Sequence, residues 1–274
     1  MMAVMNFERL LGWSLLCVLC CVGCKRQSDN EVVYTTADGK KSRNIKAVSV
    51  ADTNVPYQVV GGKPIPEEAK RLHQEARTKG EAGEYDEALA LLEQAARLAP
   101  EWAYPPYDMA FTYLLKGETA TALQKYLEAD KLEPRGFFTT KTAVWSLKKE
   151  QAGEFPSGTY LTYVSLEWTA PAKKRVVLEK MTAQIPKFTP AWKDRMLLAE
   201  NEEDRGMLLT KALGLESDVE THGILMLNQA ALLHRLGQRE QALRLTADLQ
   251  TNASSTLHTK EMAGEMEKLF KKVE

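Results

Sequence analysis

Residues 83–100 read GEYDEALALLEQAARLAP, and this stretch decides the fold. Many of its positions, and one alanine before it, recur with the same residue type 34 residues later. The recurring pairs are Ala76 and Ala110, Gly83 and Gly117, Ala88 and Ala122, Ala95 and Ala129, Leu98 and Leu132, and Pro100 and Pro134. A fixed period of this length indicates a repeat architecture, in which each unit buries its apolar face against its neighbours.

The residue types explain what each unit looks like. Ala76 and Ala88 are small enough to lie where two antiparallel helices cross, and Gly83 frees the backbone at the turn between those helices. Ala95 leaves room for the next unit to approach closely, and Pro100 ends the second helix. The spacing therefore predicts one helix hairpin in each unit.

The stretch 83–100 resembles the second half of a tetratricopeptide repeat, whose period is also 34 residues. The resemblance implies an all-α fold, a right-handed α-solenoid of helix hairpins, over residues 65–274. The clear repeats are 69–102 and 103–136, residues 137–222 are degenerate, and a further repeat spans 223–256.

Two parts of this solenoid depart from the regular repeat. The irregular part covers about 152–185, where Pro156-Ser157-Gly158 interrupts the pattern and helices are expected at 159–168 and 172–184. The last part, 257–274, carries an amphipathic pattern. We expect it to be a helix that caps the final repeat, since solenoids need a polar outer face at each end.

The N-terminus has the pattern of an exported lipoprotein. Leu10 to Gly23 is largely apolar but shorter than the roughly 20 residues that cross a bilayer, so 1–23 is predicted to be a signal peptide. Cys21-Val22-Gly23-Cys24 resembles a bacterial lipobox, which implies a covalent diacylglycerol and an N-acyl chain on Cys24. Because Lys25 rather than Asp follows the cysteine, the family's sorting signals favour the outer membrane over the inner.

The four cysteines, at positions 17, 20, 21 and 24, all precede the predicted folded part. That part therefore has no disulfide, no thiol nucleophile and no cysteine metal site. Residues 24–64 are expected to be the lipidated cysteine and a flexible tether. The alternative for the tether is a small hairpin, since Ala37-Asp38-Gly39-Lys40 follows the β-branched run at 32–36.

The composition and motifs argue against catalysis and nucleic-acid binding. The net charge is −1 and the isoelectric point about 6.5, whereas nucleic-acid-binding domains usually present a basic surface. The four histidines lack metal-ligand spacing, and no nucleophile elbow, phosphate-binding glycine loop or HExxH motif occurs. We expect no enzyme activity, no metal, no cofactor besides the lipid, and no small-molecule substrate.

The resemblance also implies where a partner binds, because first helices of successive repeats line the concave face in this family. The matching positions are His73, Arg77, Tyr104, Tyr107, Phe111, Phe138, Lys141, Trp145 and Lys148. Together they predict an aromatic groove with a basic rim, suited to a peptide with apolar and acidic groups. The alternative is that rings such as Phe111 and Trp145 simply pack between helices.

These observations predict an adaptor of the bacterial cell envelope, anchored to the membrane by its lipid, that binds envelope proteins or peptides without chemistry of its own. One alternative is a glycan- or peptidoglycan-binding lipoprotein, in which Trp145, Tyr107 and Tyr104 would stack on sugar rings. Another is an accessory, pilotin-like factor of a secretion, pilus or outer-membrane assembly machine. A hydrolase would need carboxylates such as Asp108 or Glu154 to face each other across a cleft.

Overall fold

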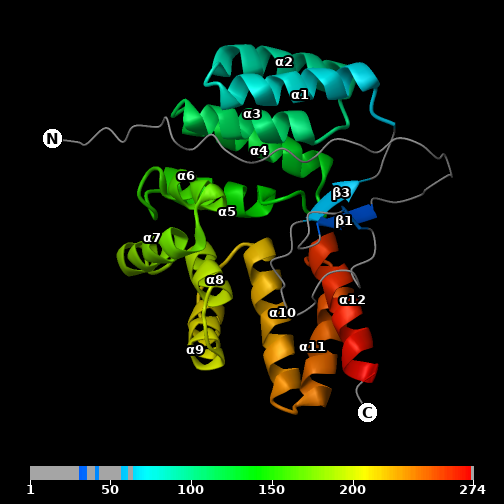
Figure 1. The fold of residues 1–274 in the computed structure, drawn as a ribbon, viewed down its shortest axis with the longest axis vertical. Coiled ribbons are helices and arrows are strands. Elements are labelled where there is room, and N and C mark those ends of the chain that lie inside the picture. Colours follow the sequence, from blue (N-terminus) through cyan, green and yellow to red (C-terminus); the bar gives the residue numbers. More distant parts are fainter. Residues whose placement is uncertain (1–30, 36–40, 43–56, 61–63, 273–274) are drawn as a thin grey trace.

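The structure, a computed structural model, describes residues 31–35, 41–42, 57–60 and 64–272. In the last of these ranges every regular element is helical (Figure 1). The elements are α1 (Glu67–Glu81), α2 (Tyr85–Leu98), α3 (Tyr104–Leu115), α4 (Thr119–Leu132), α5 (Thr140–Gln151), α6 (Thr159–Val164), the 3-10 helix η2 (Ser165–Trp168), α7 (Pro171–Gln184), α8 (Thr189–Leu197), α9 (Glu202–Leu213), α10 (Val219–Arg235), α11 (Arg239–Thr251) and α12 (Leu257–Lys272). The expected all-α fold is confirmed.

The first two repeats form helix hairpins with the same turn. Gly83 and Gly117 each have φ +80°, which only glycine adopts without strain. The N–H of the residue after each glycine, Glu84 or Glu118, donates to a carbonyl five residues back, at 2.9 and 2.8 Å. Ala88 and its repeat equivalent Ala122 are fully buried at the crossings. The geometry predicted from the 34-residue period is therefore present.

The third unit begins in the same way and then shortens. Gly153, at φ +72°, repeats the turn after α5, and Gly158 at φ +82° starts α6. The Glu150 carboxylate accepts hydrogen bonds from the N–H groups of Gly158 (2.8 Å) and Tyr160 (2.7 Å). Glu150 therefore caps α6, a single short helix that continues into η2, where a regular repeat would have a full-length second helix.

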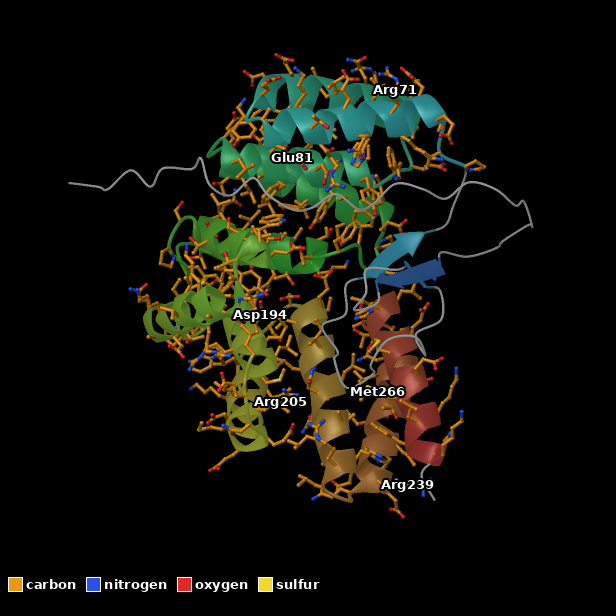
Figure 2. All side chains as sticks on the ribbon, viewed as in Figure 1. Arg71, Glu81, Asp194, Arg205, Arg239 and Met266 are labelled. Carbon is orange, nitrogen blue, oxygen red and sulfur yellow. The ribbon has the colours of Figure 1, made fainter. Side chains whose placement is uncertain are left out.

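The C-terminal hairpin, α10 and α11, is covered by α12 as expected. Met262, Met266 and Phe270 of α12 are buried against it. Arg239 is the first residue of α11 (Figure 2). Its guanidinium donates to the carbonyl oxygens of Phe270 and Lys271, near the end of α12, both at 2.8 Å. These bonds satisfy carbonyl groups that the last turn of α12 leaves without helical partners.

The array of helices changes direction in its second half. Figure 1 shows α1 to α5 stacked as layers, whereas α8 to α12 run across them. Helix α10 lies at the change, because it packs against α5, α8, α9, α11 and α12. Of the four clusters of buried side chains among residues 64–272, the two larger are one that includes Leu147, Tyr160 and Phe188 and one among α10, α11 and α12. Within residues 64–272, no helix has both the length and the apolar character needed to cross a bilayer.

Three short strands precede the helices. They are β1 (Glu31–Thr35), β2 (Lys41–Ser42) and β3 (Tyr57–Val60), in the antiparallel order β2-β1-β3. Tyr34 lies opposite Ser42, and Glu31 lies opposite Val60. β1 covers most of the β-branched run at 32–36, while the predicted turn Ala37-Asp38-Gly39-Lys40 lies outside the described residues, so the choice between tether and hairpin stays a prediction. The predicted signal peptide and Cys24 lie outside the described residues, so the division at residues 1–24 stays a prediction.

Candidate functional site

Helix α3 carries a row of aromatic side chains on one face. Tyr104, Tyr107 and Phe111 follow the i, i+3, i+7 spacing of a helical face. Two prolines in the first turn of α3 leave this face intact, because the first N–H groups of a helix have no helical acceptor. The Tyr104 ring lies edge-on to Phe137 (4.9 Å between centroids) and to Phe138 (5.3 Å). Three predicted groove residues, Tyr104, Tyr107 and Phe138, therefore share one cluster.

His73 joins this cluster from α1. Its Nε2 atom lies 2.8 Å from Oδ2 of Asp108, and its ring lies 4.8 Å from Trp102 and 5.5 Å from Tyr104. His73 is almost fully buried. It therefore links α1 to α3 and supports the surface rings, whereas the sequence placed it among the partner-binding groups. Trp102, in the linker before α3, was missed, because the repeat register assigns it to the end of the first unit.

Phe138 is held in a strained backbone conformation. Its φ is +47°, and it is the one residue other than glycine with a positive φ in the described part of the chain. Such a conformation costs a bulky residue on the order of 1–3 kcal/mol. The rings of Phe137 and Phe138 meet edge-on at 4.7 Å between centroids. Phe137 is buried in the core, while Phe138 stays half-buried against Tyr104 and Tyr107.

Tyr107 lies beneath the surface rings. Its hydroxyl is 3.0 Å from Oγ1 of Thr139, which is itself 3.3 Å from the Tyr160 hydroxyl. Its ring meets Tyr126 edge-on at 5.5 Å. Burial, followed by the nearby Tyr160, raises the pKa of Tyr107 well above its ordinary value. Tyr107, predicted as a groove residue, therefore packs beneath the surface rings.

A second pair of rings extends the row toward the C-terminal end of α3. Phe111 lies 5.4 Å from Trp168, and Trp168 is 48% exposed at the end of η2. Sequence reasoning missed Trp168, because it falls in the irregular part where no repeat register assigns a face. We call the surface rings Trp102, Tyr104, Phe111, Phe138 and Trp168 the α3 aromatic stripe.

The remaining predicted groove residues divide between the rim and the interior. Arg77, one turn beyond His73 on α1, is half-buried and forms no ion pair with another described residue. Lys141 is paired with Asp130 at 2.7 Å, and Trp145 packs between Phe155 and Phe188. Lys148 is exposed. The packing alternative is thus correct for Trp145, and the basic rim of the stripe is reduced to Arg77.

The structure also places the residues named for the glycan-binding and hydrolase alternatives. Within residues 64–272, the Trp145 ring contacts Phe155 and Phe188, whereas Tyr104 and Tyr107 both contact Phe137 and Phe138. Asp108 is bonded to His73, whereas Glu154 is exposed and paired with Lys149 at 2.9 Å. These two carboxylates do not share a cleft.

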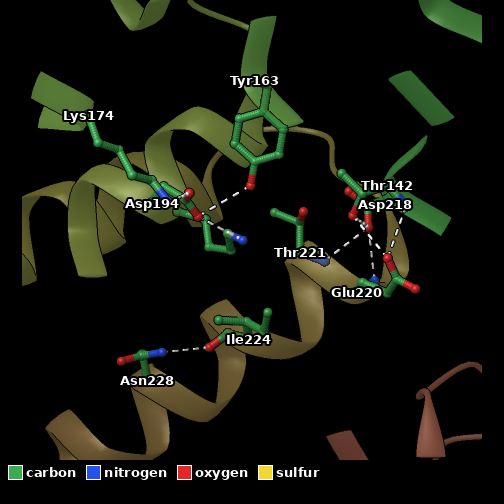
Figure 3. Close-up of polar contacts among 10 residues, drawn as sticks. Thr142, Tyr163, Lys174, Asp194, Asp218, Glu220, Thr221, Ile224 and Asn228 are labelled. Atoms are coloured by element: carbon green, nitrogen blue, oxygen red, sulfur yellow. Dashed lines mark hydrogen bonds and ion pairs between the residues drawn. The ribbon is translucent and has the colours of Figure 1, made fainter. Parts of the chain in front are cut away.

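Two groups of buried carboxylates lie away from the stripe (Figure 3). Asp194 accepts from Lys174 (2.7 Å), Lys193 (2.8 Å) and the Tyr163 hydroxyl (3.2 Å). Burial alone would raise the pKa of Asp194, but the two lysines more than offset it and hold the pKa below its ordinary value. The second group, Asp218 and Glu220, meets Thr142 at the start of α5. Among the described residues, no three His, Cys, Asp or Glu side chains gather as a metal site would require.

No protein-family model matches this sequence. No curated protein matches it either. Among solved structures, the chain is similar to the crystal structure of a thermophilic TPR protein in Thermus thermophilus, with 20% sequence identity and a TM-score of 0.30, over 72% of this chain and 97% of that chain. A likeness at this level carries no argument about function, which has to be argued from the geometry of this chain.

Proposed function

We propose that this chain is an adaptor without catalysis of its own, which binds a partner polypeptide along the α3 aromatic stripe. The observation that carries the proposal is the convergence of rings from four separate segments on one face. They come from the linker before α3, from α3 itself, from the α4–α5 loop and from η2. Tryptophan and tyrosine dominate the binding energy of protein interfaces, because each covers a large apolar area at little conformational cost.

The stripe defines the chemistry of the partner. Tyr104 and Phe111 lie two helical turns apart, about 10 Å along the helix axis. A segment with two or three apolar side chains over that length would reach both ends of the stripe. Arg77 at the edge adds a cation, so an acidic group beside the apolar residues would strengthen binding.

The stripe is best tested by comparing matched variants of the full chain. Trp168→Ala and Arg77→Ala should each weaken binding of a partner recovered with the native protein. A good anchor contributes about 2 kcal/mol or more, so the dissociation constant should rise roughly thirtyfold for Trp168→Ala, measured by isothermal titration calorimetry. Trp168 is half exposed, so its loss should leave the helical circular dichroism unchanged.

The controls lie on the C-terminal hairpin. Leu236 is an exposed apolar side chain, 63% accessible, and Arg244 of α11 is exposed and paired with Glu240. Leu236→Ala and Arg244→Ala should leave the partner's affinity unchanged. A partner that binds Trp168→Ala and Arg77→Ala normally but fails with Arg244→Ala would place its site on the other hairpin and contradict the proposal.

We further propose that the adaptor works in the bacterial cell envelope, attached through lipid on Cys24 and favouring the outer membrane. The support is the lipobox-like Cys21-Val22-Gly23-Cys24 after an apolar run of signal-peptide length. Cys24→Ala should abolish labelling by a radioactive fatty acid, whereas Cys21→Ala should leave it intact, because only Cys24 follows the glycine. Normal labelling of Cys24→Ala would rule out the assignment.

A further inference from the structure

A cavity of about 400 Å³ lies at the change of direction in the molecule, apart from the aromatic stripe. Three segments enclose it: the α4–α5 loop, the start of α10, and the loop between α11 and α12. No ring of the stripe lines it. We call it the loop cavity, and its polar lining consists of Arg135, Lys141, Ser254, Ser255, Thr256 and Lys260.

Close contacts hold the two loops of this cavity together. The Leu257 N–H donates to the Arg135 carbonyl oxygen at 2.8 Å. Gly136 has φ +109°, and a Cβ atom there would lie 3.0 Å from Cβ of Thr256. Thr256 is buried and its hydroxyl accepts from the Thr259 N–H at 3.2 Å. These contacts hold the backbone of the two loops in one position, which reduces the conformational entropy that a ligand between them would have to offset.

The lining is strongly cationic. Arg135, Lys141 and Lys260 line the cavity, and no aspartate or glutamate does. Lys141 is paired with Asp130 at 2.7 Å. Arg135 and Lys260 form no ion pair with another described residue, although Glu133 acts on Arg135 through space. Helix α12 begins at Leu257 on the cavity wall, and the positive end of its dipole adds to the field. Arg135 and Lys260 therefore bring two positive charges to the cavity that no described carboxylate binds directly.

We propose that the loop cavity binds a phosphate monoester. Such a group carries close to two negative charges at neutral pH, which matches Arg135 and Lys260, and its oxygens can accept from the hydroxyls of Ser254 and Ser255. The cavity is larger than one phosphate, and pockets of about 300–1,000 Å³ hold small organic ligands. The organic part of the ester would lie along the apolar lining, Pro134, Val219 and Leu257.

Calorimetry of the full chain with glycerol 3-phosphate tests the site directly. The native chain should show saturable binding, acetate at the same ionic strength should bind at least tenfold more weakly, and the double variant Arg135→Gln/Lys260→Gln should lose at least tenfold in affinity. The matched control Arg244→Gln/Lys180→Gln removes two exposed cations elsewhere and should bind like the native chain. An equal loss in the control, or no saturable binding up to about 10 mM together with no gain on vesicles that contain phosphatidic acid, would overturn the proposal.

A second arm distinguishes a soluble ester from a lipid headgroup. Vesicles of phosphatidylcholine, with or without phosphatidic acid, are compared for the native chain and for both double variants, all carrying the same N-terminus. A gain with phosphatidic acid that Arg135→Gln/Lys260→Gln removes would identify a headgroup as the ligand. Binding of glycerol 3-phosphate without that gain would identify a soluble ester. Either result supports the phosphate site, and the absence of both contradicts it.

Discussion

The Glu220 carboxylate, in the first turn of α10, caps the start of α5, which lies far earlier in the chain. Its oxygens accept from the N–H groups of Lys141 (3.2 Å) and Thr142 (3.0 Å), at the positive start of α5. Asp218 lies beside it and accepts from the Thr142 hydroxyl at 2.9 Å. Burial, and then the neighbouring Asp218, raise the pKa of Glu220 to about 8. The cap therefore titrates in an accessible pH range.

The raised pKa predicts a stability change with a definite sign. The ordinary pKa of 4.5 applies to the unfolded chain and about 8 to the folded one, so the folded state binds the proton more tightly between these values. The contribution of Glu220 to the free energy of unfolding is full below about pH 4.5 and is lost as the pH rises toward 8. Each pKa unit corresponds to about 1.4 kcal/mol, so the change is on the order of a few kcal/mol.

Glu220→Gln should therefore flatten the dependence of the melting temperature on pH between about pH 5 and 9, and should melt above the native chain at the alkaline end. Circular dichroism melts at several pH values measure this. The control is Glu240→Gln on α11, whose carboxylate is exposed. A Glu220→Gln chain that keeps the native slope would show that another group is responsible.

The helix hairpin is the element on which the fold depends. In the first hairpin Ala88 is 1% exposed, and a Cβ atom on Gly80 of the facing helix would lie only 4.0 Å from the Ala88 Cβ. Ala122 is fully buried in the equivalent place of the second hairpin. The two helices approach this closely because neither presents a larger side chain at the crossing.

Enlarging the crossing residue should destabilise the hairpin. Ala88→Leu has no space for its added atoms, so it should lower the free energy of unfolding by about 1–3 kcal/mol through overpacking. Urea denaturation measures the loss. Ala90→Leu, an exposed position on the same helix, serves as the matched control and should cost less than about 0.5 kcal/mol. Equal midpoints for the two variants would contradict the register of the repeat.

At the scale of the whole molecule, α10 and α12 pack closely against each other where the array of helices changes direction. A Cβ atom on Gly223 of α10 would lie 2.2 Å from Oγ1 of Thr259 on α12. Helix α10 also packs on α5 and α8, so the helix that makes this contact joins the C-terminal hairpin to the third unit. Gly223 is required for its small size and not for its backbone conformation.

Gly223→Ala should separate α10 from α12 and cost about 1–3 kcal/mol. Hydrogen exchange should quicken in α10 to α12, while α1 to α4, which do not touch this contact, keep their protection. Gly206→Ala is the matched control, since a Cβ atom there meets only Leu232 at 3.9 Å. It lies inside α9, where alanine should stabilise the helix by about 0.5–1 kcal/mol. Faster exchange in every helix, or in no helix, would contradict this role of the contact between Gly223 and Thr259.

Much of the fold was predictable, because a helix hairpin is encoded within one repeat. The glycine turns, the buried alanines, the helices at 159–168 and 172–184, and the capping helix at 257–272 all follow from spacing over a few residues. The candidate site was predictable only in part. Tyr104 and Phe138, which are 34 residues apart and so occupy matching positions of successive repeats, contact each other, and Tyr107, one turn after Tyr104, also contacts Phe138.

The sequence by itself determined which residues lie on the same face of each helix, because that depends on periodicity alone. Only the tertiary structure decided what covers each face. Trp145 packs between Phe155 and Phe188 and is partly buried, whereas Trp168, at the end of η2, stays 48% exposed. Glu220 caps α5, and Arg135 meets Leu257, across long stretches of chain. The physical reason is that such pairings depend on how helices pack after the array turns, and no local spacing specifies that packing.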